Sequence, residues 1–435
     1  MTETPAPLPL AEDTPLCHRA RQHAACHTNE YLYHQLIPYI GNKRKLLPFL
    51  AEAFAQTGIA RGTFADFFAG SGVVSRLAKR LGYRVLANDW EPYACALNTA
   101  YVGCNHPPAF ERLGGVTAVF RRLNALPPLD GYITEHYCPV DDAHPDLRHE
   151  RLFFTRKNGR KIDAMREQIA AWESEGLLDA QEKAFLLAPL VYAVSYVSNT
   201  SGLFKGFHRG WGGATGTALY RILSDIHLAL PLTLDNGQEN RVFREDAASL
   251  ARHIACDIAY LDPPYNQHPY GSNYHLLNTV VLWDKPPLAP RITAHGDKSG
   301  IRTDWRSQRR SAYNYRGQAV EALAALVETL DARRIVMSYG SEGLIPVEQV
   351  MQVLGSRGAL RVLCRPYKRY RVSSQRYSPR AYTVEYAVIV NCEKQRGGVS
   401  PERAAKRILA AEKAVRRTQE EEERERGEEP REELA

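Results

Sequence analysis

The 435-residue sequence has few cysteines and no long hydrophobic run, and each shortage excludes a class of protein. Its eight cysteines are scattered without paired spacing, unlike those of a small disulfide-bonded secreted protein. No apolar stretch approaches the roughly 18 residues that a membrane-spanning helix needs. The first residues, MTETPAPLPLAEDTPL, lack the basic region and apolar core of a secretory signal. We therefore expect a cytoplasmic protein with reduced thiols.

The sequence also lacks a recognisable metal-binding pattern. Two cysteines and three histidines gather between Cys17 and His27, but their spacing matches no common zinc-ligand pattern, and no second Cys/His pair follows at a finger-like distance. We expect no metal. Because residues 1–30 are rich in proline and then polar, we interpret them as a flexible N-terminal arm.

Acidic residues are outnumbered over most of the chain. The formal charge is +7, whereas the segment from Glu402 to the end is net acidic, so the remainder is strongly basic. A basic body suits a polyanionic partner such as a nucleic acid. The tail, residues 395–435, has a charged helical pattern that runs into EEEERERGEEPREELA and is predicted to be a solvated helix ending in disorder.

Apolar runs alternate with helical patterns in two parts of the chain, residues 31–103 and 241–394. The runs are joined by short links, which is typical of a parallel sheet. Strands are predicted at 63–67, 84–88, 258–261, 334–339 and 383–391, and helices at 73–81 and 318–331. The fold class is therefore α/β, with a doubly wound, mostly parallel, Rossmann-like sheet.

The intervening residues, 104–240, have a different character. They contain turn-rich pieces, the basic stretch FFTRKNGRKIDAMREQI and the apolar helical run AFLLAPLVYAVSYV. We interpret this segment as a mostly helical domain inserted into the sheet domain.

A Gly-rich turn, AGSG, follows the first strand and opens the next helix. Its backbone N–H groups lie at the positive end of that helix and carry little side-chain bulk, so they suit a polar or anionic ligand. Asp89 ends the next strand, 19 residues beyond Gly70, a distance at which an acid can accept hydrogen bonds from ribose hydroxyls. A purely structural turn is the alternative. Together the two features favour a cofactor that contains a nucleoside.

The stretch YLDPPYNQHPY, residues 260–270, places an acid, two prolines and an aromatic ring after a short apolar run. The adjacent prolines remove two backbone donors, so a turn that ends a strand is one interpretation. The other is a site for a planar amine. Asp262 and the carbonyl oxygen of Pro263 would accept its two hydrogens, which draws the nitrogen toward tetrahedral geometry and stabilises the developing positive charge. Pro264 helps to keep that carbonyl out of the sheet, and Tyr265 can stack on the substrate ring.

Several motifs, in this order, resemble those of DNA adenine methyltransferases that use S-adenosylmethionine. They are YIGNKRKL, DFFAGSG, LANDWEP, the FRED segment, LDPPY followed by YGSNYHLL, IVMSYG, and YKRYRV…EYAVIVN, and they span roughly residues 31–394. The matching group has its cofactor motif before the recognition domain and its DPPY motif after it. A DPPY alone also occurs in RNA guanine methyltransferases, but the early YxGNK motif and the long insertion favour the DNA enzymes.

The resemblance implies roles for individual residues. Asp262, Pro263, Pro264 and Tyr265 would be catalytic, without a covalent enzyme intermediate or a metal. The residues implied to bind S-adenosylmethionine are Tyr39, Lys43, Phe68, Ala69, Gly70, Gly72, Asp89, Asp246 and Asp262.

Some of these roles have alternatives. Tyr39 and Lys43 would touch the cofactor or the target base, although Lys43 could also be a surface lysine. Asp246 would accept from the cofactor's adenine amine, cap the helix that begins at AASL, or do both. Tyr339 would pack beside the target base or lie in the core. The YGSNYHLL segment would close over the substrate, with Asn273 and Tyr274 facing the pocket.

The target amine lies inside duplex DNA, so the base has to be flipped out of the helix. The inserted domain, 104–240, would then recognise the target sequence. Candidate DNA contacts lie in that insertion and in a basic, aromatic hairpin near the end, with solvated surface charges as the alternative. They are Arg156, Lys157, Arg160, Lys161, Asn199, Lys205, His208, Arg209, Lys368, Arg369 and Arg371.

We therefore predict a site-specific DNA adenine methyltransferase that acts on double-stranded DNA in a restriction-modification system. A cognate restriction endonuclease would act on the same DNA site without forming a stable complex with the methyltransferase. Two alternatives are an RNA amino-methyltransferase with the same DPPY chemistry and a DNA-binding relative that has lost methylation. The intact cofactor turn and DPPY motif disfavour the second.

Overall fold

The computed structural model describes residues 30–213, 216–368, 382–394 and 397–425. Of the features predicted from the sequence, the Cys17–His27 cluster, Arg369, Arg371 and the side chain of Lys368 lie outside the described residues.

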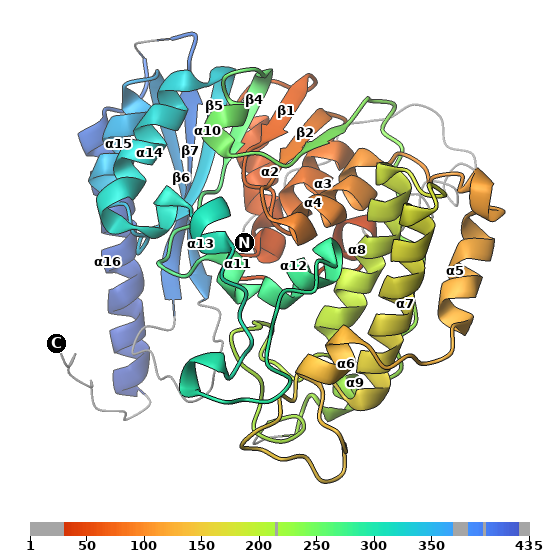
Figure 1. Ribbon diagram of the computed structural model, residues 1–435. Coiled ribbons are helices and arrows are strands. Elements are labelled where there is room, and N and C mark those ends of the chain that lie inside the picture. The colour runs from red at the N-terminus through yellow and green to blue at the C-terminus, as the bar shows by residue number, and fades with distance from the viewer. Residues whose placement is uncertain (1–29, 214–215, 369–381, 395–396, 426–435) are drawn as a thin grey trace, which may run out of the picture.

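A seven-stranded sheet with the order β3-β2-β1-β4-β5-β7-β6 forms the centre of one half of the molecule (Figure 1). Neighbouring strands are parallel except for β7, which is antiparallel to both β5 and β6. The strands are β1 (Thr63–Asp66), β2 (Arg84–Asn88), β3 (Arg241–Phe243), β4 (Ala255–Leu261), β5 (Asp331–Gly340), β6 (Ala359–Lys368) and β7 (Tyr382–Asn391). The predicted α/β fold with a mostly parallel sheet is confirmed.

The carboxyl ends of β1, β2 and β4 meet at one edge of the sheet. Asp66 of β1 is paired with Ala87 of β2 and with Tyr260 of β4, so the three strands end almost level. In open α/β sheets, ligands bind outside the carboxyl ends of the strands. The Gly-rich turn, Asp89 and Asp262 all leave the sheet at this edge.

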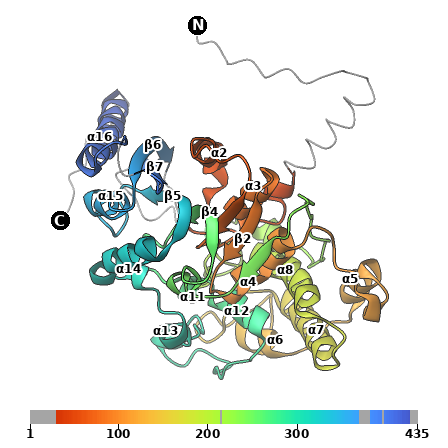
Figure 2. The ribbon, with the colours of Figure 1, turned by 90° about the horizontal axis from the view of Figure 1, so that it is seen from above.

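Helices cover both faces of the sheet, because alternate strand residues point to opposite sides (Figure 2). Phe64, Val85 and Ile258 face α2 and α3, whereas Ala65 and Leu261 face the layer that contains α14. The first layer consists of α2 (Leu47–Ala55) and α3 (Val73–Arg80), and the second of α10 (Ala247–Leu250), α14 (Arg316–Thr329), α15 (Val347–Gly355) and α16 (Pro401–Glu425).

A helical lobe lies beside the sheet and is built from two parts of the chain. Residues 104–240 supply α5 (Val116–Ala125), α6 (Tyr132–Tyr137), α7 (Arg156–Ser174), α8 (Ala180–Val197) and α9 (Leu219–Ile222), and their described part contains no strand. The helices α11 (Tyr270–Asn273) and α12 (His275–Leu282), which follow the DPPY motif, bury Leu276 and Val280 in the same hydrophobic core. We use "helical lobe" for residues 104–240 together with α11 and α12.

The helix α4 (Pro92–Asn98) joins the sheet to the helical lobe and continues into a π-helical turn, η2 (Thr99–Gly103). The buried Lys79 of α3 donates through Nζ to the carbonyl oxygens of Val102 and Cys104, at 2.8 and 2.7 Å. Carbonyl groups at a helix end need such partners when they are buried. Burial lowers the pKa of Lys79 to about 8.

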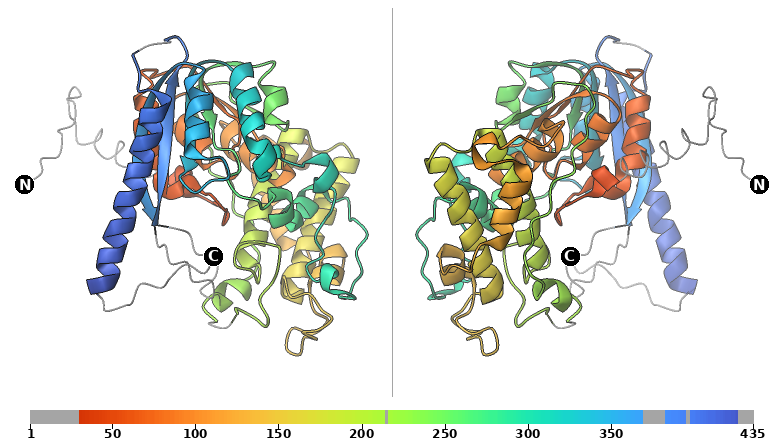
Figure 3. Two further views of the ribbon diagram at one scale, coloured as in Figure 1. Left: turned by 90° about the vertical axis from the view of Figure 1, so that its left-hand side faces the viewer. Right: turned by 90° about the vertical axis from the view of Figure 1, so that its right-hand side faces the viewer.

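The last described helix, α16, packs against β6, β7 and α15 through Ala404, Ala405 and Ile408, and its far end extends past the sheet (Figure 3). Among the described residues, no helix combines the length and the apolar character that crossing a membrane requires.

Candidate active site

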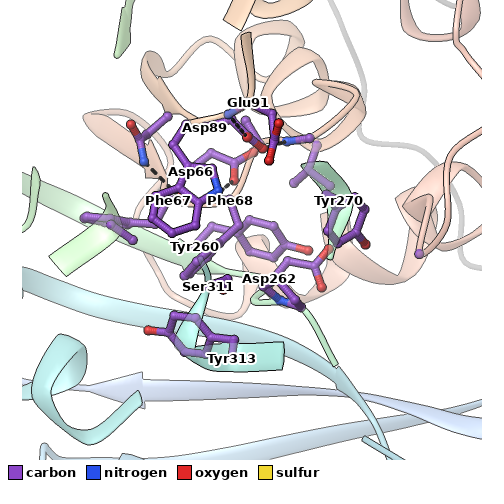
Figure 4. Close-up of a pocket in the computed structure, with 18 of the residues that line it drawn as sticks. Asp66, Phe67, Phe68, Asp89, Glu91, Tyr260, Asp262, Tyr270, Ser311 and Tyr313 are labelled. Atoms are coloured by element: carbon purple, nitrogen blue, oxygen red, sulfur yellow. Dashed lines mark hydrogen bonds between the residues drawn. The ribbon is translucent and has the colours of Figure 1, made fainter. Parts of the chain in front are cut away.

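A cavity of about 250 Å³ opens at the carboxyl edge of the sheet (Figure 4). Segments that are distant in sequence line it, including the loop at Tyr39–Lys43, the Gly-rich turn, the ends of β2 and β4, and a loop at Ser311–Tyr313. Of the residues predicted to bind the cofactor or to act in catalysis, those lining the cavity are Tyr39, Lys43, Phe68, Ala69, Gly70, Asp89, Asp246, Asp262, Pro264 and Tyr265.

The Gly-rich turn requires glycine at two positions. Gly70 has φ +51°, and a Cβ there would stand 2.8 Å from the Tyr39 ring. Gly72 has φ +78° and precedes α3, where a Cβ would stand 2.7 Å from Oδ1 of Asn98. Gly70 thus lines the cavity, whereas Gly72 does not and instead allows the turn to pack closely against Asn98.

Asp89 is tied to this turn by two backbone hydrogen bonds. Its Oδ2 accepts from the N–H of Gly70 at 2.9 Å, and its Oδ1 accepts from the N–H of Glu91 at 2.9 Å. Burial raises the pKa of Asp89 to about 6, although both hydrogen bonds act to lower it. The carboxylate is therefore fixed in place and keeps further lone pairs for hydroxyl donors.

One end of the cavity combines aromatic rings with an acid. The Phe68 ring meets Tyr313 edge to face, with centroids 5.2 Å apart. Asp246 lines the same cavity and caps α10 by accepting from the N–H groups of Ala248 and Ser249 at 3.0 and 3.2 Å. The helix-capping role considered for Asp246 is thus confirmed, and the carboxylate also lies where a bound ligand could reach it.

Asp262, which follows β4, also lines the cavity. Its Oδ1 is 2.9 Å from Nζ of Lys43 and accepts a hydrogen bond of 3.3 Å from Oγ of Ser338. Burial raises the pKa of Asp262 to about 6, and the ammonium group of Lys43 opposes that rise. No described residue donates a hydrogen bond to the carbonyl oxygen of the buried Pro263. A carboxylate and a carbonyl at adjacent positions are therefore able to accept two hydrogens.

Lys43 is buried rather than on the surface, with 3% of its side chain exposed. Its Nζ is 4.9 Å from the centre of the Tyr265 ring and 3.8 Å from Oε2 of Glu385. Burial acts to lower the pKa of Lys43, but the negative charges of Asp262 and Glu385 hold it well above its ordinary value. Lys43 is therefore an ammonium ion inside the site.

Stacked tyrosines fix the loop that carries Lys43. The Tyr39 ring lies 5.1 Å from the rings of both Tyr270 and Tyr274. The Tyr274 hydroxyl accepts from the N–H of Ile40 at 2.8 Å, and the Tyr270 hydroxyl donates to the carbonyl oxygen of Ile40 at 3.0 Å. The segment after the DPPY motif thus holds the first motif over the cavity.

The structure adds site residues that the sequence interpretation omitted. Asp66 is buried beside the Gly-rich turn, accepts from Oγ of Ser75 at 2.7 Å, and has its pKa raised by burial to about 7. Glu91 is buried, accepts from Nδ2 of Asn278 at 2.6 Å, and has its pKa raised by burial to about 7. These two acids belong to the motifs DFFAGSG and LANDWEP. Their place beside the residues already predicted to bind the cofactor could therefore have identified them. Tyr270 and Tyr313 also line the cavity.

Two other expectations concern tyrosines near the catalytic loop. Tyr339 is fully buried and meets the Tyr265 ring at 76°, with centroids 5.6 Å apart. Of the two positions considered for Tyr339, it therefore lies in the core. Tyr274 is also fully buried, and of the tyrosines in its segment it is Tyr270 that lines the cavity.

The basic residues at the start of α7 are engaged within the helical lobe. Arg156 and Arg160 contact the carboxylate of Asp130 at 2.7 and 3.2 Å. Lys157 contacts Asp225 at 2.7 Å. Lys161 donates to the carbonyl oxygens of Asn124 and Leu126. Their contact with DNA stays a prediction.

Asn199 requires a correction, because it is fully buried. Its amide nitrogen donates to the carbonyl oxygens of Leu152, His208 and Gly210, and its amide oxygen accepts from the N–H of Gly212. With both polar atoms used, the side chain holds the loop 199–212 together and is not available to a base edge.

The cations on that loop are placed differently. Arg209 is exposed, and Lys205 and His208 are partly exposed. Within the described ranges, neither the Lys205 ammonium nor the Arg209 guanidinium forms an ion pair. Burial lowers the pKa of Lys205.

In the described part of the chain, no group of three or more His, Cys, Asp or Glu side chains is arranged to hold a metal ion.

Comparison with known proteins gives a consistent result. A family model described as D12 class N6 adenine-specific DNA methyltransferase matches residues 39–329. The type II methyltransferase M.NlaIII of Neisseria lactamica is 33% identical over 342 residues, which are 77% of this chain and 92% of that protein. The modification methylase StsI of Streptococcus sanguinis and the type II methyltransferase M.FokI of Planomicrobium okeanokoites are 31% and 32% identical, and the chain spans about half of their length, 48% and 49%. No solved structure matches this chain.

Proposed function

The chain belongs to the D12 class N6 adenine-specific DNA methyltransferases, and on that premise we propose which of its residues bind the cofactor, activate the adenine amine and read the DNA. As a member of this family it is a DNA adenine methyltransferase. Membership also implies the use of S-adenosylmethionine in general.

The cavity suits S-adenosylmethionine in its distribution of acceptors and rings. Asp89 would accept from the ribose hydroxyls, Asp246 from the adenine amine, and Phe68 and Tyr313 would contact the adenine ring. The methionine end would lie against the Gly-rich turn, whose Ala69, Gly70 and Ser71 line the cavity. When bound, S-adenosylmethionine supplies an electrophilic methyl group.

Asp262 and Pro263 would activate the target amine. The lone pair of an aromatic amine is delocalised into the ring, so the nitrogen is a poor nucleophile. Acceptance of its two hydrogens by Oδ2 of Asp262 and by the carbonyl oxygen of Pro263 localises the lone pair and stabilises the positive charge that forms. Tyr265 would hold the flipped base against its ring.

One observation carries this assignment: Asp262 and the turn fixed by Asp89 border one cavity at the level ends of adjacent strands. The acceptor proposed for the ribose and the acceptor proposed for the target amine thus belong to one cavity, which supports the proposal. The proposal also extends to the biological role, namely a type II modification enzyme whose cognate endonuclease recognises the same site.

The helical lobe would recognise the target sequence. Its loop 199–212 presents Lys205, His208 and Arg209, while Asn199 fixes the loop backbone from within. Phosphate contacts would position the protein, and side chains on this loop would contact base edges. The basic residues Lys368, Arg369 and Arg371, predicted from the sequence alone, would add further DNA contacts.

The test is incubation of the purified chain and labelled S-adenosylmethionine with unmodified duplex DNA, and in parallel with RNA, followed by nucleoside mass spectrometry. We expect N6-methyladenine in DNA at a defined sequence. Label in RNA alone, or methylated cytosine in DNA, would contradict the proposal.

A further inference from the structure

Glu385, on β7, is a buried acid to which the proposed reaction has so far given no role. Only 7% of its side chain is exposed, and its Oε2 receives no hydrogen bond from any described residue. That oxygen lies 3.8 Å from Nζ of Lys43. A buried carboxylate without hydrogen bonds is costly unless a charge compensates it.

The three buried ions form a compact group with an excess of negative charge. Lys43 contributes one positive charge, and Asp262 and Glu385 contribute one negative charge each, so the group carries a net charge of −1. During methyl transfer, positive charge develops on the amine nitrogen as the N–C bond forms and the C–S bond breaks. It disappears when that nitrogen passes one proton to the Asp262 carboxylate, which returns it to solvent, while the sulfur leaves as a neutral thioether. A pair of Lys43 and Asp262 alone would be neutral and would stabilise this charge less.

We infer that Glu385 is a positioning residue for methyl transfer: it holds the ammonium of Lys43 beside Asp262 and gives the buried group the net negative charge that the amine nitrogen requires. This inference rests on the proposed role of Asp262. Glu385 also gives Lys43 a second negative partner at 3.8 Å, while Lys43 and Ser338 both contact Oδ1 of Asp262 and leave Oδ2 for the amine.

Ser338 provides a matched control, because it touches the same carboxylate without carrying a charge. Its Oγ donates to Oδ1 of Asp262 and contacts the hydroxyl of Tyr260 at 2.6 Å. The like charge of Glu385 raises the pKa of Asp262, whereas the Ser338 hydrogen bond lowers it. Removal of Glu385 and removal of Ser338 therefore shift that pKa in opposite directions.

The experiment measures kcat and both KM values from pH 5 to 8 for wild type, Glu385→Gln and Ser338→Ala. The titratable and polar groups that interact with Asp262 come from several elements: Lys43, Asp66, Tyr260, Tyr265, Tyr270, Ser338, Tyr339 and Glu385. For Glu385→Gln we expect kcat to fall about tenfold or more with KM values within about twofold, since the loss affects the charged transition state. The acid limb of its kcat profile should move to lower pH, and that of Ser338→Ala to higher pH.

Each other outcome has a defined meaning. An unchanged kcat for Glu385→Gln, or a reduced kcat with an unmoved acid limb, would overturn the inference and leave a structural role. If Glu385→Gln does not fold, Glu385→Asp is measured in its place, because it keeps the charge. A kcat within about tenfold of wild type and an unmoved acid limb would support the inference. An acid limb at lower pH would overturn it. A wild-type chain that leaves adenine unmethylated would instead overturn the proposed function, and this inference with it.

Discussion

The charge on Asp262 governs the chemistry proposed for this site. Lys43 is held protonated by the surrounding carboxylates, so its charge stays constant near neutral pH. Asp262 differs, since burial raises its pKa to about 6 while Lys43 opposes the rise. Of this ion pair, Asp262 is therefore the member whose charge changes near pH 6, and it is the one proposed to accept hydrogens from the amine.

We predict that kcat falls as the pH decreases through about 6, because protonated Asp262 loses the negative charge that stabilises the amine. One unit below the pKa, about a tenth of the carboxyl groups remain ionised, so kcat at pH 5 should be about tenfold below its plateau. The measurement is kcat against pH at saturating S-adenosylmethionine. Saturation matters because Asp89 also has a pKa of about 6. Below saturation, the titration of Asp89 would change the affinity for S-adenosylmethionine, and with it the rate, in the same pH range. A flat profile from pH 5 to 8 would contradict the assignment.

Two acids that line the cavity could be predicted from local motifs, although Asp66 and Glu91 of the same motifs were omitted. Asp89 and Asp262 each end a strand beside a turn, and the turn chemistry is visible in the sequence. Tyr313 could not be found in this way, because it reaches the cavity through the folding of a loop far along the chain. The polar type of Asn199 suggested a base contact, but its burial depends on tertiary packing that composition does not reveal.

At the scale of elements, strand positions followed from apolar runs that end at polar residues. The prediction of 84–88 coincides with β2, and the predicted strands at 258–261 and 334–339 lie within the longer β4 and β5. The extra residues at the start of β4 are only partly covered or exposed, so hydrophobicity could not mark them. The π-helical turn η2 was not predicted, because nothing in its own sequence distinguishes it from an extension of α4.

We predict that Lys79→Met destabilises the protein, since the carbonyl oxygens of Val102 and Cys104 lose their donor at the end of η2. Buried carbonyl groups without partners should lower the free energy of unfolding by roughly 2–4 kcal/mol. Urea denaturation measures this, and Arg80→Met, at an exposed position of the same helix, should change it by less than about 0.5 kcal/mol. Equal stability of the two variants would show that Lys79 does not support η2.

At the scale of the whole molecule, the segment after the DPPY motif joins the sheet to the helical lobe. Nε of Arg166 on α7 donates to the carbonyl oxygen of Val280 on α12 at 2.6 Å, and Asn278 of α12 binds Glu91 at the cavity. The segment after the DPPY motif, the cavity wall and the core of the lobe are therefore parts of one continuous structure. A fixed lobe can hold a DNA site in register with Asp262.

Salt dependence should distinguish the two groups of basic residues on this lobe. Arg209 has no ion-pair partner in the described structure, whereas Arg156 contacts Asp130. We predict that Arg209→Ala makes the slope of log K against log salt less steep by about 0.9, the loss of one phosphate contact. Arg156→Ala should change the slope by less, because Asp130 already neutralises part of the charge of that guanidinium. Fluorescence anisotropy with duplex DNA over a range of salt concentrations measures both slopes. A larger change for Arg156→Ala than for Arg209→Ala would place the DNA on the face at α7.

The central claim is that Asp262 acts on the adenine amine during methyl transfer, and the single-turnover rate of Asp262→Asn tests it most directly. Asparagine keeps the shape of the side chain but not its charge, and Glu385 still compensates Lys43 in this variant. We expect methylation to be slowed by about a thousandfold, with the affinities for S-adenosylmethionine and duplex DNA within about threefold of wild type. A rate within about tenfold of wild type would contradict it, since the loss of the charge would then be unimportant to the chemical step.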